Sequence, residues 1–400
     1  MKKLFCLAVI SCFVALSPIC SFAKDNLTLK SEFEGGKLFK AGVLNVVVMK
    51  GDFHEMGRQY GALLKDEMNE FYEMTAVKTI MGAKKISYKE LLEFSIAGYD
   101  RNPMYVKEWV RGMGETSGLG LEKQIIVSEV LGALIMAPDA ACSGLITWKD
   151  YSSGGKTIAG RNWDLGTFAL EPYQKFLTVN VFNPTGYGYG VADINYIGSI
   201  MWQSAMNSAG LFYDLQNGSM SDPYAAKNRL NSNSALMSMM LDSGTIEQAD
   251  AFFSGVRAEG GLIINVADAD KAYAYEWGTS DYRRRVDDEN GFLADSNDYT
   301  DPTWQVTREL PDGAASGFTK ERRINLAAMA KKYKGRMDAS KMMEIFDKSI
   351  PDGGPSFFDK ASGLKTYYSI VAVPSELKLW LNVRDLQGWT EIDLKPLFID

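Results

Sequence analysis

The chain has 400 residues, of which 46% are apolar and 12% aromatic, enough for one large hydrophobic core or two smaller ones. The 43 basic and 50 acidic residues give a formal net charge of −7, which argues against a nucleic acid as partner. One histidine and four cysteines leave little material for a zinc site or a thiol–imidazole pair. We therefore expect no metal and no cofactor.

Residues 1–23 have the pattern of a secretory signal peptide. Two lysines open the chain, an apolar run from Leu4 to Cys20 follows, and Ser21-Phe22-Ala23 forms a small-x-small cleavage site. No later run approaches the roughly 18 apolar residues that a spanning helix needs. The sequence predicts an exported protein, periplasmic or extracellular, with no transmembrane segment.

The character of the chain changes near residue 140. Between Glu55 and Met136, apolar residues recur at spacings of three and four, which predicts helices in the part of the chain before Cys142. After Cys142, short β-rich segments bounded by Gly, Asn, Asp or Pro alternate with helical stretches. This order indicates a layered α/β or α+β domain over residues 142–400.

A hairpin is predicted directly after Cys142. The cysteine opens a strand, a Gly-rich turn follows at Ser152 to Gly155, and a second strand returns to Arg161 and Asp164. The end of the second strand in such a hairpin lies beside the start of the first. A cation near sulfur lowers the pKa of a thiol, and a carboxylate can hold a protonated α-amine. A plain ion pair after a turn is the alternative interpretation of Arg161 and Asp164.

Cys142 is the one thiol that remains once the signal peptide is removed. If it is a nucleophile, its base can be its own α-amino group, freed by cleavage before the cysteine, with a reference pKa of about 7.7 to 8.0. A buried, inert cysteine is the alternative. A thiol protease that uses His54 is disfavoured, because this histidine precedes the cysteine in the chain and a strand hairpin is predicted after the cysteine.

Five short segments carry further motifs in a fixed order along the chain. They are Gly51–Gly61 (GDFHEMGRQYG), Cys142 with the Gly-Arg-Asn-Trp-Asp at residues 160–164, Met206–Asn217, Ala294–Asn297 and Thr319–Ile324 (TKERRI). Together they resemble the cysteine-type N-terminal nucleophile (Ntn) hydrolases. The families most similar are choloylglycine hydrolase with penicillin V acylase, and acyl-CoA:6-aminopenicillanate acyltransferase.

The resemblance implies roles for six residues. Cys142 would be nucleophile and base, Arg161 would sit against the sulfur, Asp164 would orient the amine, Asn217 would donate to the oxyanion, Asn297 would help to fix amine and substrate, and Arg322 would complete the ring of charges. Two positions stay open. Family members often have histidine after the second asparagine, where this chain has Asp298, so Asp295 competes with Asn297. Arg323 competes with its neighbour Arg322.

The resemblance also implies a fold and an activity. The fold would be an α+β fold, a four-layer αββα Ntn-hydrolase sandwich. A helical prosegment, residues 24–141, would precede it and would be retained or removed after autocatalytic cleavage before Cys142. The activity would be hydrolysis of a linear, non-peptide amide through a Cys142 thioester, with a small-molecule N-acyl amide as substrate. An acyltransferase and a non-catalytic exported binding protein on the same fold are the alternatives, and a homo-oligomer is left open.

Overall fold

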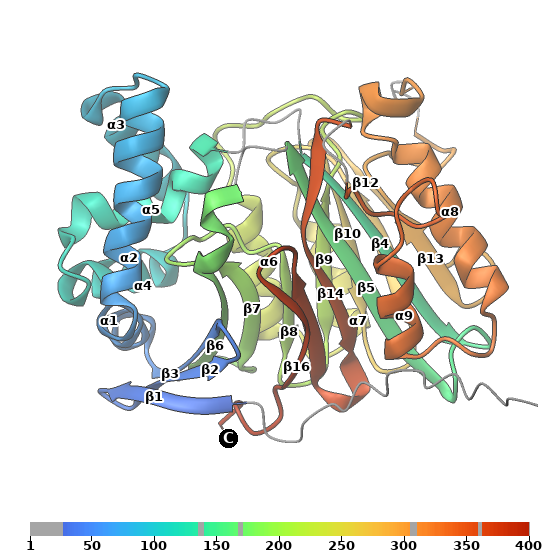
Figure 1. The fold of residues 1–400 in the computed structure, drawn as a ribbon, viewed down its shortest axis with the longest axis horizontal. Coiled ribbons are helices and arrows are strands. Elements are labelled where there is room, and N and C mark those ends of the chain that lie inside the picture. Colours follow the sequence, from blue (N-terminus) through green and yellow to red (C-terminus); the bar gives the residue numbers. More distant parts are fainter. Residues whose placement is uncertain (1–26, 135–139, 167–170, 305–309, 359–361, 400) are drawn as a thin grey trace, which may run out of the picture.

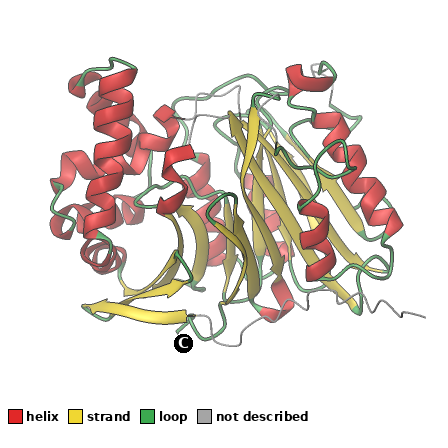
Figure 2. Ribbon diagram, viewed as in Figure 1, coloured by secondary structure: helices red, strands yellow, loops and turns green. Residues whose placement is uncertain are grey.

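Two β-sheets packed face to face form the centre of the molecule, and helices cover both outer faces (Figures 1 and 2). The computed structural model describes residues 27–134, 140–166, 171–304, 310–358 and 362–399. The predicted signal peptide lies outside these ranges. Within them, the predicted four-layer αββα sandwich is confirmed.

The larger sheet has ten strands in the order β1-β2-β3-β6-β7-β8-β9-β10-β11-β12. Neighbouring strands are antiparallel except β3 and β6, which run parallel. The strands are β1 (Leu27–Phe33), β2 (Gly36–Ala41), β3 (Leu44–Gly51), β6 (Leu177–Pro184), β7 (Val191–Tyr196), β8 (Ser204–Asn207), β9 (Phe212–Asn217), β10 (Leu262–Ala267), β11 (Ala272–Trp277) and β12 (Tyr282–Arg285).

The smaller sheet is antiparallel and has the order β13-β4-β5-β14-β15-β16. Its inner face packs on the larger sheet, where β4 lies against β9, and helices α8 and α9 cover its outer face (Figure 1). Helices α6 and α7 pack on the larger sheet. The elements are β13 (Phe292–Asp295), β4 (Ala140–Lys149), β5 (Gly155–Gly166), β14 (Leu364–Val373), β15 (Lys378–Val383), β16 (Gln387–Asp393), α6 (Ser232–Asp242), α7 (Ile246–Gly255), α8 (Thr319–Lys332) and α9 (Ala339–Phe346), with 3₁₀ turns at Glu171–Phe176, Gly313–Ser316 and Pro374–Glu376.

The N-terminal helices form a group at one side of the sandwich, which Figure 1 shows in blue and cyan. Capping boxes start two of them, at Asp52 with Glu55 and at Ser87 with Glu90. None of the helices in the described ranges has the length and apolarity to cross a membrane. The group comprises α1 (Phe53–Leu63), α2 (Lys65–Tyr72), the π-helical stretch η1 (Glu73–Ala83), α3 (Tyr88–Tyr99), α4 (Met104–Thr116) and α5 (Gly120–Leu134).

The part of the chain before Cys142 is not helical throughout, which differs from the helical prosegment over residues 24–141 that the resemblance implies. Residues 27–51 form three strands, and β3 lies in the middle of the larger sheet. Its sequence LNVVVMKG is a short apolar run rich in β-branched residues, typical of a strand that is buried on both faces. Because β3 pairs with β6, the residues before and after Cys142 share one sheet.

Candidate active site

The predicted hairpin is present and sets the geometry around Cys142. Strands β4 and β5 pair antiparallel, with Cys142 opposite Trp163, Ala141 opposite Asp164 and Gly144 opposite Arg161. Side chains of a strand alternate between its two faces, so Cys142 and Arg161 both point to the face between the two sheets. The short loop between the strands thus brings residues about 20 positions apart into contact.

Cys142 is buried within β4, and its sulfur, its backbone N–H and its carbonyl each make a polar contact. Its Sγ lies 3.4 Å from Nη2 of Arg161. Its backbone N–H donates to Oδ1 of Asn297 over 2.9 Å, and its carbonyl accepts from Nη1 of Arg322. Burial raises the pKa of the Cys142 thiol, while the positive charge of Arg161 opposes that rise. The net effect keeps the pKa of this thiol above its usual value.

Arg161 is fully buried and has a fixed orientation. Its guanidinium donates to the carbonyl of Leu215 over 2.6 Å and to Ser204 Oγ over 3.1 Å. It also donates to Oε1 of Gln203 and to the hydroxyl of Tyr368. Burial lowers the pKa of Arg161, but the nearby Cys142 and other acidic groups raise it by more, so the net pKa is above its usual value. The cation beside the sulfur is thus permanent.

Asp164 and Arg322 form a second charged pair beside the backbone of Cys142. Oδ2 of Asp164 lies 3.7 Å from Nη1 of Arg322, and both side chains are fully buried. Oδ1 of Asp164 accepts from Thr366 Oγ1 over 2.6 Å, whereas Oδ2 has no hydrogen-bond donor among the described atoms. Burial raises the pKa of Asp164 to about 6, against the effect of Arg322. One carboxylate oxygen is therefore available for a new donor.

Asn297 links Cys142 to Asn217. Its Oδ1 also accepts from Nη2 of Arg322 over 2.7 Å, and its Nδ2 donates to the carbonyl of Asn217 over 2.8 Å. The Asn217 side chain has no bond to Cys142. Its Oδ1 accepts from the backbone of Ser219, and for its Nδ2 no partner is found in the described part of the chain.

The structure separates the two pairs of alternatives. Asp295 forms an ion pair with Arg285 over 2.6 Å and has no contact with Cys142, so Asn297 occupies the position at the cysteine. Arg323 is partly exposed and pairs with Asp298, whereas its neighbour Arg322 is buried at the site. The six residues proposed from the sequence lie together, with Asn217 reached through its backbone.

His54 lies away from this group. Its Nε2 is 2.9 Å from Glu115 on α4, at the partly exposed surface of the helical group. Sequence reasoning missed Thr366 and Tyr368 on β14, which contact Asp164 and Arg161. The polar run from Lys365 to Ser369, in a strand that ends in apolar residues, is the signal that could have found them. Over the described ranges no cluster of three or more potential metal ligands is present.

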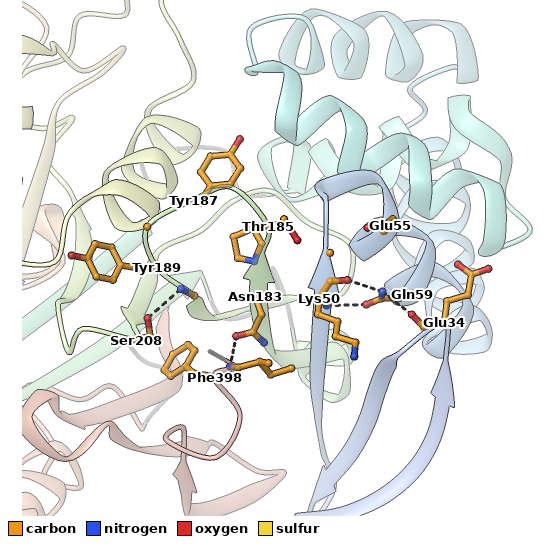
Figure 3. A pocket seen from close by; sticks show the side chains of 15 residues that line it. Glu34, Lys50, Glu55, Gln59, Asn183, Thr185, Tyr187, Tyr189, Ser208 and Phe398 are labelled. Carbon is orange, nitrogen blue, oxygen red and sulfur yellow. Dashed lines mark hydrogen bonds between the residues drawn. The ribbon is translucent and has the colours of Figure 1, made fainter.

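A hollow of about 850 Å³ lies elsewhere, lined by residues from 34–59, 183–190, 208 and 398–399. Figure 3 shows Lys50, Asn183 and Phe398 among the side chains around it. Asn183 is at the end of β6 where β7 begins, whereas Arg161 contacts Ser204, at the opposite end of the neighbouring strands. The hollow is therefore separate from the group at Cys142.

Comparison with known proteins yields solved structures only. No family model and no curated protein matches the chain. An N-acylethanolamine-hydrolyzing acid amidase ortholog from Caenorhabditis elegans aligns at 16% identity and a TM-score of 0.41, over 58% of this chain and 93% of its own. A mutant conjugated bile acid hydrolase from Clostridium perfringens aligns at 14% identity and a TM-score of 0.45, over 64% of this chain and 93% of its own. A penicillin V acylase from Agrobacterium tumefaciens aligns at 11% identity and a TM-score of 0.41, over 64% of this chain and 88% of its own.

All three of these proteins are cysteine Ntn hydrolases, the class that the sequence motifs resemble. At 11% to 16% identity the likeness concerns the backbone alone. A shared fold does not determine reaction or substrate, which depend on the side chains of the site.

Proposed function

We propose that the protein is an amide hydrolase of the cysteine Ntn type that cleaves its own chain before Cys142. The observation that carries the proposal is the set of contacts at this residue. A permanent cation lies 3.4 Å from the sulfur, an amide oxygen and a guanidinium bind its backbone, and a free carboxylate oxygen lies beside the same guanidinium. A merely structural cysteine needs none of these contacts.

Self-cleavage is the first reaction. The sulfur of Cys142 attacks the carbonyl carbon of Ala141, the C–N bond breaks, and the nitrogen takes up the proton that the thiol lost. Water then hydrolyses the thioester, which leaves a carboxylate on Ala141 and a free α-amine on Cys142. Oδ1 of Asn297 already accepts from this nitrogen, and the unpaired Oδ2 of Asp164 is the acceptor we assign to the new ammonium.

Turnover of an external amide uses the same atoms. The neutral α-amine takes the thiol proton, and the thiolate, stabilised by Arg161, attacks the acyl carbon of the substrate. We assign the unpaired Nδ2 of Asn217 to the oxyanion of the tetrahedral intermediate. The ammonium returns the proton to the leaving amine, and water resolves the thioester to release the acid.

The substrate class we propose is a linear, non-peptide N-acyl amide of small size. The resemblance of the sequence motifs to the cysteine Ntn hydrolases supports this choice. Export from the cytosol, inferred from residues 1–23, separates the protein from cytosolic acyl-CoA and favours water over an amine as the acceptor of the acyl group.

Intact mass, N-terminal sequencing and an amide panel test the proposal together. Active protein should contain a fragment that begins Cys142-Ser143-Gly144, and Cys142→Ala should remain one inactive chain. Ser143→Ala is the matched control, because the buried side chain of Ser143 points to the other face of β4. This variant should still be cleaved before Cys142. Amine release is measured from N-acyl amino acids, bile-acid conjugates, phenoxyacyl penicillin and acyl homoserine lactones, with and without acyl-CoA.

Full activity with an intact Ala141–Cys142 bond would rule out the mechanism. Turnover that requires a second acyl donor or an amine acceptor would favour a transferase. Saturable binding without turnover, and without a trapped thioester, would favour the binding protein.

A further inference from the structure

Glu276 is a buried carboxylate outside the group at Cys142. It lies on β11, and its side chain is fully inaccessible to solvent. Among the described residues, all hydrogen bonds to its side chain come from residues 300–304 of one loop: the carboxylate accepts from the backbone and hydroxyl of Thr300, from the backbone of Asp301 and from the indole of Trp304. A buried charge is tolerated only when donors surround it, so this loop and the carboxylate fix each other.

The same loop begins with Asn297, the residue that binds the backbone of Cys142. Between the two ends, Tyr299 donates its N–H to Ser221 and stacks on Trp304 with ring centroids 4.9 Å apart. A Cβ placed on Gly218 would lie only 2.8 Å from the Tyr299 ring, so the loop packs closely on the turn that follows Asn217. Residues 297–304 thus run from the cysteine, past Asn217, to Glu276.

Arg285 on β12 holds the other side of Asn297. Its Nη1 donates to Asp295 over 2.6 Å and to the Thr300 hydroxyl over 2.7 Å, and it lies 3.9 Å from Glu276. Glu276 and Arg285 belong to the larger sheet, whereas β13, which leads into Asn297, belongs to the smaller one. The segment that carries Asn297 is therefore fixed from the opposite sheet on both of its sides.

We propose that Glu276 is a positioning residue, which holds the 297–304 loop so that Asn297 binds the Cys142 nitrogen. The inference rests on the proposed function. Glu276 contacts neither Asn297 nor Cys142. In this proposal it sets the distance between the Asn297 amide and the Cys142 nitrogen through the loop that it holds. Displacement of catalytic groups by about 1 Å is known to lower rates by about 100-fold.

Glu276→Gln tests the assignment with almost no change in volume. The amide replaces one acceptor oxygen by an NH₂ group that faces N–H donors, so at least one loop bond is lost. We expect faster hydrogen–deuterium exchange in peptides that cover 296–304, and a kcat lower by about 10- to 100-fold with KM within about threefold. Glu276→Asp retains the carboxylate and should recover part of the loss.

Asp250→Asn is the matched control. Asp250 on α7 accepts from Tyr275 and pairs with Arg284, the residues next to Glu276 and Arg285, but on the outer face of the sheet. It should leave exchange in 296–304 and kcat unchanged. If Glu276→Gln does not fold, Thr300→Val removes one hydroxyl from the same cluster with little change in shape, and it should show the same effects at smaller size.

The inference would be overturned if a folded Glu276 or Thr300 variant had the same hydrogen–deuterium exchange in 296–304 and the same kcat as the wild type. Faster exchange with unchanged kcat would overturn it as well. If cleaved wild-type protein hydrolyses no amide, the proposed function fails, while the exchange measurement still decides whether Glu276 holds the loop.

Discussion

Burial has different consequences for the ionisable groups at Cys142. It raises the pKa values of the Cys142 thiol and of Asp164 and lowers that of Arg322, whereas Arg161 stays charged because of its acidic neighbours. The intact chain therefore holds a protonated thiol next to a cation. Under the proposed function, the base for turnover is the α-amine that cleavage before Cys142 would free.

The raised pKa of Asp164 predicts a pH dependence of stability. Since its folded-state pKa is about 6 against 3.8, the folded state binds more protons between these values, and stability falls as pH rises through them. A shift of about two pKa units corresponds to ~3 kcal/mol. Urea unfolding of uncleaved Cys142→Ala at pH 4 and pH 7 should show this loss, and adding Asp164→Asn should reduce it. An equal loss with and without Asp164 would contradict the assignment.

Arg161→Lys should lower kcat by about 100-fold in correctly cleaved protein. Lysine keeps the charge but lacks the rigid fork with which Arg161 binds Ser204 through Nη1 and both the carbonyl of Leu215 and the sulfur of Cys142 through Nη2. Arg58→Lys is the matched control, because Arg58 makes a similar fork to surface glutamates, and His54→Gln is a second one. Both should keep kcat within about tenfold. A deep loss with His54→Gln would favour a thiol–imidazole pair.

At the scale of elements, the opening motif Gly51–Gly61 has a structural explanation. Gly51 has a φ of +112°, a conformation that favours glycine, and Glu55 completes the capping box of α1. A Cβ on Gly57 would lie 2.2 Å from the carbonyl oxygen of Trp109, so α1 and α4 cross with their backbones almost in contact. The motif thus builds a helix start and a tight crossing under the sheet.

Gly57→Ala should destabilise the protein by about 1 to 3 kcal/mol, because a backbone atom of α4 must move to make room. Gly132→Ala on α5 is the control. Its added methyl would meet only the tip of Phe94 at 3.8 Å, so the higher helix propensity of alanine should raise stability by up to about 1 kcal/mol. Thermal and urea unfolding of uncleaved Cys142→Ala measure both changes, and equal effects would contradict the tight crossing.

At the scale of the whole molecule, the segment before Cys142 is part of the sandwich. Strand β3 pairs with β6 from Asn45 opposite Thr178 to Gly51 opposite Pro184, and the helical group buries the apolar residues of α1, α4 and α5 against the same core. Asn183 adds a direct link, since its Nδ2 donates to the carbonyls of Met49 and Leu397. Cutting one peptide bond before Cys142 removes none of these contacts.

The two fragments should therefore stay together after cleavage. We expect them to co-elute in size-exclusion chromatography under native conditions and to separate only in denaturant, because the hydrophobic burial at the interface persists. Uncleaved Cys142→Ala gives the reference elution volume. Release of the N-terminal fragment from native, cleaved protein would contradict the shared sheet.

Local patterns determined much of this protein. The hairpin after Cys142 is short in sequence, so its turn and strands predict that Arg161 and Asp164 return to the cysteine. Apolar periodicity likewise predicts the helices between Glu55 and Met136. These features depend on neighbours in the chain, which the sequence displays directly.

The tertiary structure decided what depends on distant partners. That β3 joins the sheet beside β6 follows from a parallel pairing across about 130 residues, which no local pattern specifies. The choice of Asn297 over Asp295 rests on Arg285, which binds the aspartate, and the choice of Arg322 over Arg323 rests on which side of α8 faces the cysteine. Adjacent residues of similar chemistry are told apart only by the contacts that burial gives them, because the sequence records their identity but not their neighbours.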